Sequence, residues 1–195
     1  MENNKIEVHP FEPFIPDGAR ILFLGTFPPK SERWSIDFFY PNYNNDFWKM
    51  TGLLFFENKD YFCIPELKKF DLSKIIKFAT ENGIAIYDTA TEIIRLKDNA
   101  SDKFLDIRKQ INLFDFLNKY QTIRSVVTTG EKAASVIAEI TNTVLPKMGE
   151  TITFKYNDVE YTHTRMPSTS RAFPMKLENK AEYYKTAFEL ANIKF

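Results

Sequence analysis

Short apolar runs along the chain predict strands that are buried on both faces of a sheet. The runs that share this pattern are residues 21–24, 84–87 and 125–128. The first run is uninterrupted and stops at Gly25. Residues 152–156 and 159–166 flank an Asn-Asp turn, which predicts a hairpin that leads into a last long strand.

Apolar residues at helical spacing predict helices between and after these strands. The predicted helices are residues 67–82, 112–120, 130–140 and 176–193. In the first of them Leu72, Ile75 and Ala79 lie on one face, and Gly83 supplies the stop. A further helix is expected to begin near Phe47, with its first aromatic residues packed in the core.

Strands that alternate with helices at this spacing predict an α/β fold. We expect a single domain over residues 1–195, built as a three-layer α/β/α sandwich with a central, mostly parallel four-stranded sheet. Ligands of such sheets bind beyond the carboxyl ends of the strands, so the loops at this edge should converge. These loops follow Leu24, Tyr87, Thr128 and Met166.

The composition fits a domain with a substantial core. Of the 195 residues 44% are hydrophobic and 19 are phenylalanine, so disorder is not expected. The 26 basic and 26 acidic residues cancel, which argues against binding nucleic acid by bulk charge and still permits a local basic patch. Cys63 is the one cysteine, which excludes an intramolecular disulfide and a thiolate metal cage.

The sequence contains no leader-like segment and no apolar run that approaches the roughly 20 residues needed to span a bilayer. We therefore expect a soluble, cytoplasmic protein. Because the chain has two histidines and no carboxylate pair to support them, we expect no metal and no cofactor. We also expect a monomer.

The segment Gly25-Thr26-Phe27-Pro28-Pro29 leaves the first buried strand abruptly. Glycine lets the backbone approach a ligand closely, and the two prolines stiffen the loop. The amides of Thr26 and Phe27 are candidates to donate hydrogen bonds to a carbonyl oxygen or a developing anion. A simple strand-to-loop turn is the alternative interpretation.

Residues 34–48 are rich in both aromatic and polar side chains and fit neither a strand nor a helix period. A nucleobase flipped out of DNA needs a flat apolar face to stack on and amide groups to read its edge. Phe39 or Tyr40 is the candidate for stacking. Asn45 is a candidate to contact the base, with an N-cap of the following helix as the alternative. Asp37 is a candidate to bind water, or else an exposed loop carboxylate.

Ser168, Thr169, Ser170 and Arg171 lie between the last strand and the last helix. Small hydroxyl side chains suit contact with phosphates and sugars. Part of such a loop can enter the duplex and fill the gap that a flipped nucleotide leaves. Arg171 is a candidate to fill that gap or to pair with phosphate. A Ser/Thr cap before a helix is the alternative.

Together, three segments resemble the uracil-DNA glycosylase superfamily, most closely its mismatch-specific and hypoxanthine-DNA glycosylase branches. Residues 25–29 resemble Gly-x-Asn-Pro-Gly, residues 45–49 match Asn-x-Phe-Trp-Lys, and residues 166–172 resemble Leu-Pro-Ser-Thr-Ser-Pro-Ala. Three positions depart from the motifs. Phe27 stands where the mismatch-specific branch has the asparagine that positions the attacking water, Pro29 replaces the last glycine of the same motif, and Arg171 replaces a proline.

The resemblance implies a cofactor-free, monofunctional DNA glycosylase that releases uracil, hypoxanthine or mismatched thymine from DNA. Asn45 resembles the asparagine that supports catalysis in the hypoxanthine branch when the first loop lacks one. Gly25 belongs to the implied base-binding loop. Asp88 matches a strand-end aspartate of the family, and residues 100–102 resemble an element that lines the same pocket.

Two other classes of function remain open. One is a nucleobase- or damaged-DNA-binding protein that kept the pocket and lost the chemistry, which Phe27 and the neutral net charge favour. The other is a hydrolase that acts on free nucleosides or small molecules. DNA affinity without an abasic product would indicate the first, and turnover of free nucleosides the second.

Overall fold

The computed structural model describes residues 5–96 and 102–195. Its largest sheet has five strands in the order β5-β2-β8-β10-β9. The strands are β2 (Ile21–Gly25), β5 (Ile84–Asp88), β8 (Ser125–Thr129), β9 (Thr151–Tyr156) and β10 (Val159–Met166). The strands β5, β2, β8 and β10 run parallel to one another. At the edge of the sheet β9 pairs antiparallel with β10. The mostly parallel central sheet is confirmed.

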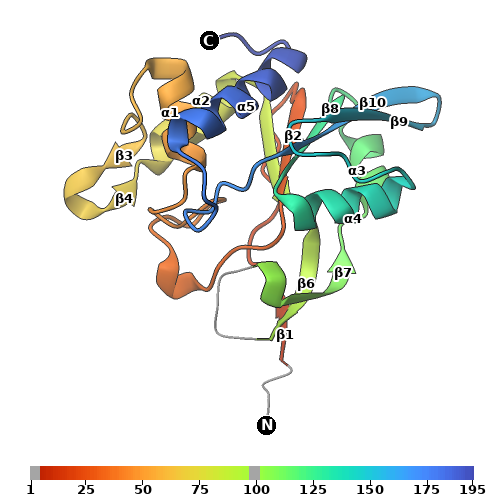
Figure 1. Cartoon of the computed structure of the whole chain (residues 1–195), viewed down its shortest axis with the longest axis horizontal. Coiled ribbons are helices and arrows are strands. Elements are labelled where there is room, and N and C mark those ends of the chain that lie inside the picture. The colour runs from red at the N-terminus through yellow and green to blue at the C-terminus, as the bar shows by residue number, and fades with distance from the viewer. Residues whose placement is uncertain (1–4, 97–101) are drawn as a thin grey trace.

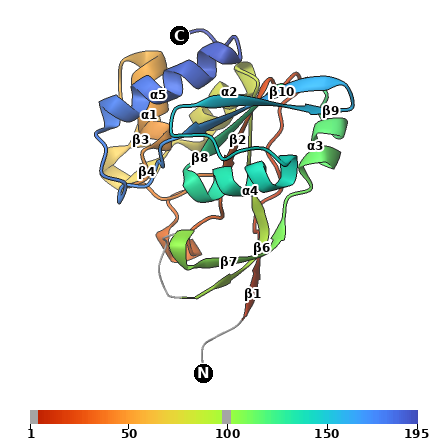
Figure 2. The ribbon, with the colours of Figure 1, turned by 45° about the vertical axis from the view of Figure 1, so that its right-hand side comes forward.

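Helices cover both faces of this sheet (Figures 1 and 2). They are α1 (Phe47–Phe56), α2 (Leu72–Glu81), α3 (Leu113–Lys119), α4 (Glu131–Thr141) and α5 (Leu177–Leu190). In both views α1, α2 and α5 lie on one side, and α3 and α4 lie on the other. The mixed α/β fold is therefore confirmed. The expected count of four strands is wrong, because β9 joins the sheet through its hairpin with β10.

A second sheet, which the sequence analysis did not predict, flanks the carboxyl edge of the first (Figure 2). It is antiparallel, in the order β1-β6-β7, with β1 (Ile6–Val8), β6 (Ala90–Arg95) and β7 (Leu105–Gln110). Its small core consists of Ala90, Ile93 and Leu105, with Phe27 and Ile107 packed against them. The strand β1 is only three residues long and pairs with a segment more than 80 residues away, so it leaves no local hydrophobic period to detect.

The shorter elements are a two-stranded sheet and three turns of 3₁₀-helix. They are β3 (Cys63–Ile64), β4 (Lys69–Phe70), η1 (Ser31–Arg33), η2 (Pro65–Leu67) and η3 (Asp102–Phe104). No helix within residues 5–96 and 102–195 is long and apolar enough to cross a membrane.

Aromatic side chains fill the space between the central sheet and the α1–α5 layer. Phe23 of β2 contacts the rings of Phe47 and Phe188 at centroid distances of 5.3 Å each. Trp48 is 1% exposed, and its indole N–H donates to the Phe39 carbonyl oxygen at 3.0 Å. The predicted core role of Phe47 and Trp48 is confirmed. The bond to Phe39 also ties the aromatic loop to the start of α1.

His163 of β10 is fully buried between β8 and β9. Its Nε2 atom lies 3.0 Å from the Thr128 hydroxyl oxygen, and among the described residues its Nδ1 atom has no hydrogen-bond partner. Burial lowers the pKa of His163 to about 4. The folded protein therefore holds this ring neutral at pH values where an unfolded chain protonates it.

We expect this histidine to make the protein less stable in acid. The pKa of His163 is lower in the folded than in the unfolded protein. Its contribution to the free energy of unfolding is therefore fully present above pH 6.5 and is lost as the pH falls toward 4. At pH 4 the free energy of unfolding should be lower by roughly 3 kcal/mol. Urea unfolding of the wild type and of His163→Gln at pH 7 and pH 4 measures the difference. An equal acid-induced loss in both proteins would contradict the assignment.

Candidate active site

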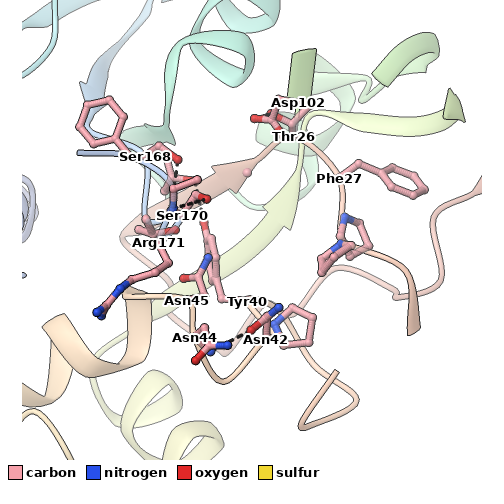
Figure 3. Close-up of a pocket in the computed structure, with 18 of the residues that line it drawn as sticks. Thr26, Phe27, Tyr40, Asn42, Asn44, Asn45, Asp102, Ser168, Ser170 and Arg171 are labelled. Atoms are coloured by element: carbon pink, nitrogen blue, oxygen red, sulfur yellow. Dashed lines mark hydrogen bonds between the residues drawn. The ribbon is translucent and has the colours of Figure 1, made fainter. Parts of the chain in front are cut away.

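A pocket of about 650 Å³ opens at the carboxyl edge of the central sheet. The ends of β2, β5 and β8 contribute Gly25, Asp88 and Thr129, and the loop after β10 contributes Ser168. The four loops that the sequence predicted to converge thus line one pocket. The aromatic loop before α1 supplies a further wall, and Figure 3 shows these segments facing one another.

The pocket brings together nearly all of the candidate residues. Those that line it are Gly25, Thr26, Phe27, Phe39, Tyr40, Asn45, Ser168, Thr169, Ser170 and Arg171. Asp37 is exposed and is not among the lining residues. Of the family element at residues 100–102, Asp102 lines the pocket, whereas Ala100 and Ser101 lie outside the described residues.

Gly25 is required where the first loop leaves β2. A Cβ atom at this position would lie 2.4 Å from Oδ1 of Asp88. The Thr26 hydroxyl donates to Oδ2 of Asp102 at 2.9 Å. Among the described residues, the backbone amides of Thr26 and Phe27 have no hydrogen-bond partner. These two amides therefore remain available to a ligand.

The Phe27 ring does not serve the pocket. In Figure 3 it points away from Asn45 and the serine loop. It packs edge-on against His9 with a centroid distance of 5.3 Å, and the Arg95 guanidinium lies 5.9 Å from its centroid. Arg95 also donates to the Pro28 carbonyl oxygen at 3.1 Å and pairs with Glu7. The second sheet therefore anchors the first loop through the Phe27 side chain, and only the backbone of Phe27 is left for chemistry.

Asn45 has a structural bond and a free donor group. Its Oδ1 atom accepts a hydrogen bond from the Phe47 amide at 2.9 Å, which closes a turn just before α1. No described residue accepts a hydrogen bond from its Nδ2 group. This bond fixes the side chain, and its amide donor can then meet a ligand in the pocket. The N-cap interpretation of Asn45 is wrong, because Asp46 occupies the N-cap position of α1.

The two aromatic candidates differ in how they are held. Phe39 is 3% exposed and packs against His9 and Tyr87. Tyr40 stacks face to face on Phe47 with centroids 4.0 Å apart, and its hydroxyl lies 3.3 Å from Oγ1 of Thr129. Tyr40 also has a φ of 51°, a left-handed conformation that is unfavourable for an aromatic residue. Such strain is typical of functional sites.

The second loop is stiffened by its own hydroxyl groups. The Ser168 hydroxyl accepts from the Ser170 amide at 3.2 Å, and the Ser170 hydroxyl accepts from the Ala172 amide at 3.3 Å. Thr169 is 3% exposed, whereas Arg171 is exposed at the mouth of the pocket. In the part of the chain that the structure describes, Arg171 forms no ion pair. Its charge is therefore available to a phosphate.

A buried ion pair joins the two walls of the pocket. Lys180 of α5 is 0% exposed, and its Nζ atom lies 2.7 Å from Oδ2 of Asp46. The same Nζ atom donates to the Ser170 carbonyl oxygen at 2.9 Å. The Asp46 amide donates to the Thr169 carbonyl oxygen at 2.9 Å. Asp46, the residue after Asn45, is thus bonded to the second loop directly through its backbone amide and indirectly, by way of Lys180, through its side chain.

Two carboxyl groups, those of Asp88 and Asp102, line the pocket. Asp88 is 7% exposed, and burial raises its pKa, an effect that hydrogen bonding to His9 opposes. Burial also raises the pKa of Asp102, and the nearby charge of Asp88 raises it further. No group of three or more His, Cys, Asp or Glu side chains in residues 5–96 and 102–195 is arranged to hold a metal ion.

Among solved structures, the chain is similar to the solution NMR structure of a "putative Uracil DNA glycosylase" from Methanosarcina acetivorans. The TM-score is 0.65 at 19% sequence identity, over 96% of this chain and 99% of the other. The chain has that fold. No family model and no curated protein sequence matches it. Similarity at this level establishes the glycosylase-type fold, and the function has to be argued from the site.

Several residues around this pocket did not stand out in the sequence. His9 and Lys180 occur in segments that look like an irregular terminus and a solvated helix face. Their partners are Asp88 and Asp46, at sequence separations of 79 and 134 residues. Only Asp88 carried a signal, because it ends a buried strand at the edge where ligands bind.

Proposed function

We propose that the protein is a monofunctional DNA glycosylase of the uracil-DNA glycosylase superfamily. The observation that carries this proposal is the convergence of three sets of groups on one pocket. These are the unpaired amides of Thr26 and Phe27, the Nδ2 donor of Asn45, and the hydroxyl-rich loop that ends in Arg171. Hydrogen-bond donors that face an aromatic wall are what a flipped base requires.

In this proposal the damaged base enters the pocket and stacks on an aromatic ring. We assign this stacking to Tyr40 rather than Phe39, because Phe39 is almost completely buried among other rings. The Thr26 and Phe27 amides and the Asn45 side chain donate hydrogen bonds to the base and stabilise the charge that it gains as the glycosidic bond breaks. Water then adds to C1′ of the cationic sugar.

The DNA backbone is held at the mouth of the pocket. Ser170 and Arg171 are exposed there, and Arg33 lies on the same rim. Arginine and serine groups suit phosphate contacts, which position the duplex without reading its sequence. No lysine is among the described residues that line the pocket, so no amine is placed to form a Schiff base with the sugar. This supports hydrolysis by water as the reaction.

The proposal is tested by base release from short oligonucleotides that carry uracil, hypoxanthine or thymine opposite guanine, in single- and double-stranded form. Alkaline cleavage reports the abasic product, and an undamaged oligonucleotide of the same sequence is the control. We expect an abasic product from at least one of the damaged substrates, which also names the base. The identity of the released base then indicates the branch of the superfamily, mismatch-specific or hypoxanthine-type.

The absence of product from every substrate at high enzyme concentration would contradict the proposal. Affinity for the damaged oligonucleotides without cleavage would then favour a damaged-DNA-binding protein. Turnover of free nucleosides, with DNA binding that lacks a steep dependence on salt, would favour a nucleoside hydrolase instead.

A further inference from the structure

A buried histidine–carboxyl pair reaches the pocket through Asp88 and has no role in the hydrolysis described above. Nε2 of His9 lies 2.9 Å from Oδ2 of Asp88, and the two side chains are 2% and 10% exposed. The other carboxyl oxygen, Oδ1, lies over Gly25 at the base of the first loop. Asp88 thus presents one oxygen to His9 and the other to the base of the first loop, and it is among the residues that line the pocket.

The Nδ1 atom of His9 has backbone hydrogen-bond partners of both kinds. Its Nδ1 atom lies 3.1 Å from the Phe11 amide nitrogen and 2.9 Å from the Phe11 carbonyl oxygen. A neutral ring accepts from the amide, and a charged ring donates to the carbonyl group, so neither state leaves Nδ1 without a partner. Rings that surround His9 shield it from water: Phe11, Phe27, Phe39 and Tyr87. The pair can therefore hold a proton on either member.

The groups around Asp88 bear on whether its carboxyl group carries a proton. The titratable side chains that face Asp88 are those of His9, Tyr40, Tyr87 and Asp102. Behind Asp102 lie the cations Lys132 and Arg95, which bond to backbone carbonyl oxygens. Burial raises the pKa of both carboxyl groups and so favours their neutral forms.

We propose that Asp88, hydrogen-bonded to His9, is the general acid that protonates the departing base. This inference rests on the proposed glycosylase function. The bond between C1′ and the base nitrogen breaks with its electron pair going to the base, and the base takes the proton of Asp88. Water adds to C1′ and releases a proton, which restores the pair. The products are the free base and an abasic site, and no co-reactant is consumed.

The test uses the substrate from the oligonucleotide panel that the wild type cleaves best, and measures kcat/KM from pH 5 to pH 9. The wild-type rate should fall as the pH rises and the pair loses its proton, with a slope that approaches tenfold per pH unit. Asp88→Asn keeps the shape and an acceptor for His9 but cannot supply a proton. Its kcat/KM should be about 10²- to 10⁴-fold lower and should lose this decline with pH.

The matched control is Asp158→Asn, which makes the same substitution in the exposed β9–β10 turn and should keep wild-type activity and pH profile. A wild-type rate that rises with pH would overturn the inference without any variant. So would an Asp88→Asn protein that stays within tenfold of the wild type with an unchanged profile, and both results would leave the glycosylase proposal standing. A wild type that releases no base would overturn the proposed function, and the inference with it.

Discussion

Replacing Lys180 with methionine should lower the free energy of unfolding by about 3–5 kcal/mol. The lysine ammonium is 0% exposed and bonds both to the Asp46 carboxylate and to the Ser170 carbonyl oxygen. Methionine fills a similar volume but leaves the Asp46 carboxylate, 6% exposed, without its cation. An unpaired buried charge is costly. Urea unfolding at pH 7 measures the change.

Lys185→Met is the matched control on the same helix. Lys185 is exposed, so this substitution should change the free energy of unfolding by no more than about 0.5 kcal/mol. The double substitution Asp46→Leu with Lys180→Met removes both charges and should recover much of the lost stability. If Lys180→Met unfolded with the wild-type free energy, the ion pair would have no role in holding the two walls of the pocket together.

The sequence predicted those parts of the fold that leave a local pattern. The continuous apolar runs identified β2, β5 and β8, and the bounds of α4 and α5 were predicted to within a few residues, because buried strands and amphipathic helices have periods of their own. The β1-β6-β7 sheet left no such pattern. Its strands mix charged and apolar residues, and β1 pairs with a segment more than 80 residues away.

The loops of the site could be predicted because their glycine, proline and hydroxyl residues lie together in sequence. The contacts that complete the site could not. Lys180 looks like a solvated helix residue until α5 packs against α1, and His9 meets Asp88 only through the tertiary fold. Phe27 also shows that the side chain of a motif residue can point away from the pocket, since its ring packs against the second sheet.

Asn45→Ala should reduce kcat for base release by about 10²- to 10³-fold, the loss expected when one preorganised donor to a developing charge is removed. The same change also removes the hydrogen bond to the Phe47 amide, which should cost about 1 kcal/mol of stability. Activity must therefore be compared at equal folded fraction, with unfolding followed by circular dichroism. Single-turnover cleavage of the best oligonucleotide gives the rate.

Asn45→Asp separates the two roles of this side chain. Aspartate keeps an oxygen that accepts from the Phe47 amide, and its charge suits the start of α1, so stability should stay within about 0.5 kcal/mol of the wild type. It loses the Nδ2 donor, so its rate should fall as far as that of Asn45→Ala. A carboxylate has no N–H group that could replace the lost donor. A stable Asn45→Asp protein with the wild-type rate would show that Asn45 only closes the turn before the helix, and the donors to the base would then be the Thr26 and Phe27 amides alone.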